Sequence, residues 1–278
     1  MMAYFPMFLD IEGKHCLVVG GGKVALRKVQ VLLDFGAHVT VVAQQIEKEI
    51  KDIAEQTQRK ADEISSMGFP RSEERGESYG QVTIYERAYK KNDLQDKVFV
   101  VAATDNAAVN HEIAEDARKR NIPVNAVDQP KDCTFIFPSY IRKKNVVGAF
   151  SSAGNSPVLT QYLKKQMQEI LTDELGEINE YMGSIRSTVK ASLDTERERK
   201  IVYRKVLQTL LERKEAGEDI DLSEREWQEI LDGVKSPFIE MKVRHGNRKK
   251  EVINGSNKKI KTNGCNARHG KRKPCESG

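Results

Sequence analysis

Short apolar runs alternate with longer amphipathic stretches through the first half of the chain. Five runs rich in β-branched and other apolar residues predict strands, at 15–19, 38–43, 81–86, 98–103 and 122–127. Apolar residues recur at helical spacing in 24–35 and 109–121, and the polar stretch 46–64 is compatible with a helix. Strands alternating with helices predict an α/β fold with a Rossmann-type parallel sheet.

The pattern changes after Pro130. Two apolar runs, 134–141 and 145–150, flank the basic turn 142–144 and favour an antiparallel hairpin. A loop of small residues follows at 151–157, where Ser156 is placed to cap a helix that starts at Pro157. The chain beyond it is helical in pattern, over 158–172, 174–192, 195–216 and 223–233.

A glycine motif joins the first predicted strand to the first predicted helix. Its spacing is Gly20-x-Gly22-x-x-Ala25, the form typical of dinucleotide sites. Gly20 permits the tight turn, Gly22 lets the backbone approach a pyrophosphate, and Ala25 lets the helix pack on the strand. The first helical residues, Lys23 and Val24, then offer N–H groups to the phosphates. The alternative is a plain strand-to-helix turn that binds nothing.

The second predicted strand ends without the acidic residue that usually binds the ribose. Gln44 and Gln45 follow Ala43, and no arginine is there to favour a 2′-phosphate. We therefore expect NAD, held by amide and backbone contacts from Gln44 and Gln45.

Asp105 follows the most apolar of the predicted strands, 98–103. Ligands of open parallel sheets lie outside the carboxyl ends of the strands, so Thr104 and Asp105 are expected to face the cofactor. Asp105 is thereby placed to face both the nucleotide and a substrate. The alternative is that Asp105 only caps the next helix.

Charge divides the chain unevenly. Residues 242–278 carry twelve Lys or Arg against two Glu, whereas the rest is mildly acidic. We expect 241–278 to be a disordered, solvated tail rather than a nucleic-acid-binding segment, and 65–80 to be a surface loop. Four scattered cysteines and the lack of a long apolar run or a signal peptide predict a cytoplasmic protein with no membrane contact.

Five segments occur together in one order: the glycine motif, Val101–Asp105, Asn125–Pro130, Thr134–Ser139 and Ser151–Pro157. In this combination the chain resembles the precorrin-2 dehydrogenase family, the N-terminal module of siroheme synthases, over about residues 3–235. The longer charged loop at 57–79 and the basic tail depart from the family pattern.

The resemblance implies NAD-dependent oxidation of precorrin-2 to sirohydrochlorin, and in some members also insertion of ferrous iron to give sirohaem. It also implies a homodimer whose protomers intertwine, and a chain that folds in three parts. These are a Rossmann domain at 1–120, a small β dimerisation segment with the hairpin at 121–155, and an all-helical C-terminal domain at 156–240. Asp105 matches the family's active-site aspartate. The rival hypotheses are a module that senses NAD without turnover and a nucleic-acid binder that depends on the tail.

Four further residues are candidates for binding the substrate. Thr134 lies where the family carries a hydroxyl that faces the pocket; its alternative is an ordinary strand threonine. Ser152, Asn155 and Ser156 could bind the propionate and acetate groups of the substrate through backbone N–H groups at a helix start, or could simply cap that helix. We favour a turn for Asp128 and a surface or core position for His111, and we expect no fixed metal site.

Overall fold

The computed structural model describes residues 4–66 and 80–235. It divides the chain into two compact units, Met1–Thr172 and Asp173–Gly278. The predicted tail and most of the predicted surface loop lie outside the described residues. None of the described helices is long and apolar enough to cross a membrane.

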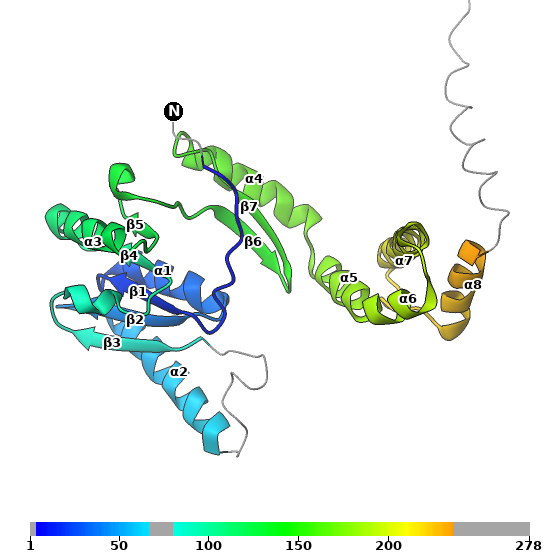
Figure 1. Ribbon diagram of the computed structural model, residues 1–278, viewed down its shortest axis with the longest axis horizontal. Coiled ribbons are helices and arrows are strands. Elements are labelled where there is room, and N and C mark those ends of the chain that lie inside the picture. Colours follow the sequence, from blue (N-terminus) through cyan, green and yellow to red (C-terminus); the bar gives the residue numbers. More distant parts are fainter. Residues whose placement is uncertain (1–3, 67–79, 236–278) are drawn as a thin grey trace, which may run out of the picture. The chain divides into compact units, whose positions relative to one another are not determined.

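A five-stranded parallel sheet forms the first unit (Figure 1), as the alternating pattern predicts. The strand order is β3-β2-β1-β4-β5, so the chain builds outward from β1 in one direction and then, from β4, in the other. The strands are β1 His15–Val19, β2 His38–Ala43, β3 Val82–Glu86, β4 Phe99–Ala102 and β5 Val124–Ala126. Two 3₁₀ turns, Lys91–Leu94 and Pro130–Asp132, lie in the connections.

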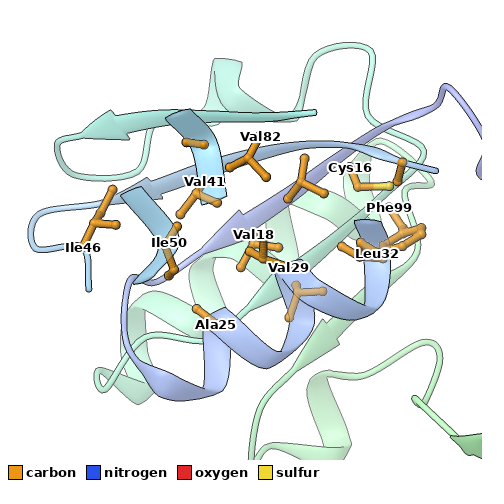
Figure 2. Close-up of a cluster of buried hydrophobic side chains, with 14 residues drawn as sticks. Cys16, Val18, Ala25, Val29, Leu32, Val41, Ile46, Ile50, Val82 and Phe99 are labelled. Carbon is orange, nitrogen blue, oxygen red and sulfur yellow. The ribbon is translucent and has the colours of Figure 1, made fainter. Parts of the chain in front are cut away.

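Both faces of the sheet are buried because alternate residues of each strand point to opposite sides. On one face Cys16 and Val18 pack against α1 (Lys23–Asp34) and α2 (Lys48–Ser66), as Figure 2 shows. On the other face Leu17 and Val19 pack with α3 (Ala107–Lys119). The predicted helices are therefore confirmed, and they sandwich the strands in three layers.

The hairpin is confirmed but begins later than predicted. β6 (Ser139–Lys143) pairs antiparallel with β7 (Val146–Phe150). Residues 134–138, predicted as strand, do not join it. Phe135 instead packs edge-on against Phe99, with ring centroids 5.3 Å apart. The aromatic side chains of this segment extend the core beside α1, so core packing rather than strand pairing accounts for their apolar pattern.

The compact units do not follow the expected segment boundaries. β5 is a strand of the main sheet, although residues from 121 onward were expected in a separate dimerisation segment. Helix α4 (Pro157–Ile170) falls in the first unit rather than in a helical domain that begins at 156. It contacts β6 and β7 (Figure 1), and the hairpin thus keeps α4 with the sheet-containing unit.

In the described part of the second unit, residues 173–235, four helices surround a small apolar core. They are α5 Asp173–Ser184, α6 Arg186–Ser192, α7 Glu196–Ala216 and α8 Glu224–Lys235. Val202, Val206 and Leu210 are fully buried along one side of α7, at helical spacing. Gly217 ends α7 in the left-handed conformation, with φ 71°. Arg213 bonds the carboxylate of Glu226 and so joins α7 to α8.

The N-terminus of α7 offers a direct test of this packing. Thr195 accepts from the N–H of Glu198, and the Glu198 carboxylate accepts in return from the N–H of Thr195. We expect Thr195→Ala to lower the free energy of unfolding of this unit by about 1 kcal/mol, because the capping box is lost. Trp227 is the chain's one tryptophan and packs on this core, so its fluorescence in urea reports the change.

The matched control is Thr188→Ala, an exposed threonine within α6. That variant should unfold within about 0.5 kcal/mol of the parent, as surface substitutions generally do. Equal losses in the two variants would contradict a specific role for the cap.

Candidate nucleotide-binding and active site

The strand order reverses between β1 and β4, and both strands end at the same edge of the sheet. Val19 pairs with Ala102 at that edge, so the glycine turn after β1 lies beside the loop after β4. Such a switch point is where open α/β sheets bind their ligands. The structure therefore brings the glycine motif and the Thr104–Asp105 segment together, as the sequence predicts.

Two of the three glycines are required by backbone packing. A Cβ on Gly20 would lie 2.2 Å from the carbonyl oxygen of Ala103, and the φ of Gly20 is +127°. A Cβ on Gly21 would lie 2.0 Å from the carbonyl oxygen of Gln45. Any side chain at either position would push the loops after β4 and β2 away from the turn.

Gly22 is different, because among the described residues no atom lies within 4 Å of its Cβ position. Gly22 is the N-cap residue of α1, a helix with no side-chain cap and no acidic residue in its first turn. The open space in front of Gly22, the helix N-terminus and the exposed Lys23 thus face outward together, while Ala25 packs inside. These residues fit a pyrophosphate, which needs N–H donors and positive potential.

Gln44 and Gln45 occupy the expected place at the end of β2, and both are exposed. The backbone of Gln45 lies against Gly21, so this segment borders the glycine turn. Val24, on the first turn of α1, is 43% exposed. The predicted cofactor-binding set therefore surrounds the one turn.

Asp105 does not cap the helix that follows it. The cap is Asn106, whose Oδ1 accepts from the N–H groups of Ala108 (2.9 Å) and Val109 (3.3 Å). Asp105 is exposed in the bend between Thr104 and Asn106. Its carboxylate is therefore available at the carboxyl edge of the sheet, beside the glycine turn.

Two neighbours of Asp105 were not found from the sequence. Asn110 is buried in α3, and its Oδ1 accepts from the hydroxyl of Thr104 at 2.7 Å. Gln129 Nε2 donates to the carbonyl of Ala107 (3.0 Å), which ties the loop after β5 to the start of α3. An asparagine one turn after a helix cap is a weak signal in sequence, and Gln129 gives none. Asp128 lies in a turn with φ 58°, in line with the reading favoured for it.

His111, on α3, contacts the carboxylate of Asp132. Its Nδ1 lies 3.0 Å from the carboxylate of Asp132, which also accepts from Arg118. The hydrogen bond from His111, then that from Arg118, lowers the pKa of Asp132. Across residues 4–66 and 80–235, no group of three or more His, Cys, Asp or Glu could hold a metal ion.

The predicted substrate-binding residues make local contacts instead. The hydroxyl of Thr134 accepts from the N–H of Val124 (2.8 Å), at the end of β5 away from Asp105. Ser156 caps α4 by accepting from Leu159, and Ser152 accepts from the N–H of Ser156. Asn155 is exposed in the same loop. The structure therefore gives three of these hydroxyls structural partners and does not bring Thr134 to Asp105.

A pocket of about 420 Å³ lies in the same unit but at the opposite edge of the sheet. Its lining includes Glu12, Gly36 and Gly80, which precede β1, β2 and β3. Because ligands of this fold bind at the carboxyl edge, we assign the nucleotide to the glycine turn rather than to this pocket.

The contrast between Gly20 and Gly22 gives a sharp test of that assignment. Gly22→Ala should fold with unchanged stability, because its methyl group meets open space, but should weaken NAD binding at least tenfold by filling the phosphate position. Gly20→Ala should instead lower stability by about 3 kcal/mol, from the clash and the unfavourable φ. Calorimetric titration with NAD and thermal unfolding measure the two effects. Unchanged NAD affinity in Gly22→Ala would contradict the assigned site.

Comparison with known proteins agrees with this geometry. Residues 7–139 match the family model described as "Putative NAD(P)-binding". A solved structure of SirC, a precorrin-2 dehydrogenase, is similar in fold, with a TM-score of 0.52 and 23% identity; the match covers 84% of this chain and 99% of that one.

Siroheme synthases are similar in sequence. That of Nitrosospira multiformis is 37% identical over 207 residues, which are 74% of this chain and 40% of the relative. That of Ruthia magnifica is 32% identical over 232 residues, 84% of this chain and 44% of the relative. The chain thus spans less than half the length of these curated relatives. Residues 7–139 therefore form an NAD(P)-binding Rossmann domain, and over the shared part the chain is similar to the siroheme synthases.

Proposed function

We propose that this chain oxidises precorrin-2 to sirohydrochlorin with NAD as the oxidant. The observation that carries the proposal is the contact between Gly20 and the backbone of Ala103, two residues before Asp105. A nucleotide on the glycine turn would therefore lie beside an exposed carboxylate. The names of the similar proteins supply the substrate class.

The chain's own residues divide the work. The N-terminus of α1 and the open space at Gly22 bind the pyrophosphate, and Gln44 and Gln45 take the place of the usual ribose-binding acid. Bound NAD supplies the hydride acceptor. Asp105 accepts the proton that leaves the tetrapyrrole when the hydride is removed. No arginine directly follows Gln44 and Gln45 in the sequence, which favours NAD over NADP.

Substrate contacts outside Asp105 stay predictions. Among the residues of the 151–157 loop, Asn155 is the strongest candidate, since Ser152 and Ser156 already accept hydrogen bonds within the loop. A carboxylate of the substrate could also bind at the N-terminus of α4. Thr134 would have to release Val124 to reach a ligand with its hydroxyl.

Iron insertion is the second candidate activity, favoured by the name siroheme synthase that the relatives carry. Ferrous iron would be a substrate that passes through the site. The same Asp105 would accept the pyrrole N–H protons that the metal displaces.

We also propose a homodimer that pairs through α4. Val158, Tyr162 and Ile170 are 80%, 58% and 60% exposed, which leaves an apolar stripe uncovered on this helix. Such a contiguous stripe is typical of a protein interface. A cytoplasmic location fits the free thiols of Cys16 and Cys133.

The activity is tested by an anaerobic assay of precorrin-2 with NAD or NADP, with and without ferrous iron, followed by visible absorbance. Asp105→Asn should lower kcat at least about 100-fold, the scale of a lost general base, and leave NAD affinity within about threefold. Asp128→Asn is the matched control, because asparagine tolerates the positive φ of that turn. NAD binding without turnover would favour the sensing module instead.

The dimer is tested by light scattering coupled to size exclusion. Val158→Glu with Tyr162→Glu places two charges on the apolar stripe and should shift the dimer to a monomer of unchanged helix content. Gln161→Glu with Gln168→Lys, which adds one charge of each sign at exposed positions of the same helix beside the stripe, is the control. A parent chain that is monomeric at all concentrations would contradict the proposal.

A further inference from the structure

Asn110 is a buried polar side chain whose hydrogen bonds all go to one other residue. It is 2% exposed, on the first full turn of α3. Its Oδ1 accepts from the backbone N–H of Thr104 (3.1 Å) and from the Thr104 hydroxyl (2.7 Å). Its Nδ2 donates to the Thr104 carbonyl (3.0 Å). One side chain therefore bonds both the backbone N–H and the backbone carbonyl of Thr104.

These bonds hold the chain on the near side of Asp105. The far side is held by Asn106, which caps α3 and also donates its N–H to the Thr104 hydroxyl (3.2 Å). Ala103, one residue before Thr104, donates its N–H to Val19 (2.7 Å). Asp105 thus sits in a bend whose flanking residues are anchored to β1 and to α3.

A buried amide needs hydrogen-bond partners, and any nearby donor and acceptor would meet that need. The side chain of Asn110 instead bonds Thr104, the residue directly before Asp105. A leucine at this position would fill the same space but would leave the N–H and the carbonyl of Thr104 without these bonds, free to rotate the bend that carries Asp105. Small displacements of a catalytic group cost large factors in rate.

We infer that Asn110 is a positioning residue, which fixes the place of Asp105 at the glycine turn through its bonds to Thr104. The inference rests on the proposed role of Asp105. The helix α3 then does more than cover the sheet. Its N-cap Asn106 and its residue Asn110 together form a clamp, which holds the bend that carries Asp105 from both sides.

The direct experiment compares Asn110→Ala with Glu112→Ala, an exposed residue of the same helix. Asn110→Ala should lower kcat for precorrin-2 about 10- to 100-fold, while the Kd for NAD changes less than about threefold because the glycine turn is untouched. The amide of Thr104 should exchange with deuterium about tenfold faster. Glu112→Ala should change none of these quantities. A normal kcat in Asn110→Ala would overturn the inference.

A double-mutant cycle separates positioning from stability. In an Asp105→Asn background, Asn110→Ala should lower kcat less than twofold further, because the group it positions is already gone. An equal loss in both backgrounds would overturn the inference. If Asp105→Asn alone keeps the parent kcat, the proposed function of Asp105 fails, whereas the exchange rate of Thr104 still reports on the clamp.

An isosteric variant covers the case in which Asn110→Ala does not fold. Asn110→Asp keeps the volume and both accepted bonds, but it replaces the donor to the Thr104 carbonyl with an oxygen and places an ionisable group at a buried position. It should lower kcat less than the alanine variant but more than threefold, with NAD affinity preserved. A parent-like kcat in Asn110→Asp, together with failure of Asn110→Ala to fold, would assign Asn110 to stability alone and overturn the inference.

Discussion

The close approach of two backbone segments at the switch point is the constraint on which the site depends. Ala103 donates its N–H to Val19, and the carbonyl of Ala103 occupies the space where a Cβ of residue 20 would be. Glycine at position 20 is therefore needed before any ligand is considered. Because this contact holds the loop after β4 against the turn after β1, a phosphate-binding backbone and a carboxylate come to share one edge of the sheet. Neither strand could supply both.

Much of the fold follows from the sequence because each strand is buried on both faces and each long helix has one apolar side. The strands β1 and β2 and the helices α7 and α8 lie within a few residues of their predicted bounds, whereas the single helix predicted over 174–192 is two helices, α5 and α6. The strand predicted to begin at 134 shows the limit of such reasoning. Residues 134–138 have an alternating aromatic pattern, but Phe135 and Phe137 pack on Phe99 and beside α1 rather than in a ladder. Periodicity shows that a face is buried and does not say which element covers it.

The site was less accessible to sequence reasoning, for a similar reason. Asp105 and Asn106 are both residue types that cap helices, and only the backbone geometry shows that Asn106 does so and leaves Asp105 exposed. The clamp formed by Asn110 spans six residues from a strand end into a helix, a relation that no local motif records. The glycine spacing was easier to recognise, because its demand is on the backbone and only one residue type meets it.

The turns after β1 and β2 offer the proposed cofactor few charged side chains. No acid follows β2 at Gln44 or Gln45, and the N-terminus of α1 has no side-chain cap. Neutral Gln44 and Gln45 contribute no charge, so the attraction for the cofactor must come from helix N–H groups and Lys23. Backbone groups keep their geometry when side chains change. They can therefore bind the cofactor's phosphates, but they do not select the substrate that reacts with it. Under the proposed function, selectivity for the reaction then rests on the Asp105 carboxylate and its placement. That placement is shared by Gly20, Asn106 and Asn110, none of which needs to touch the substrate.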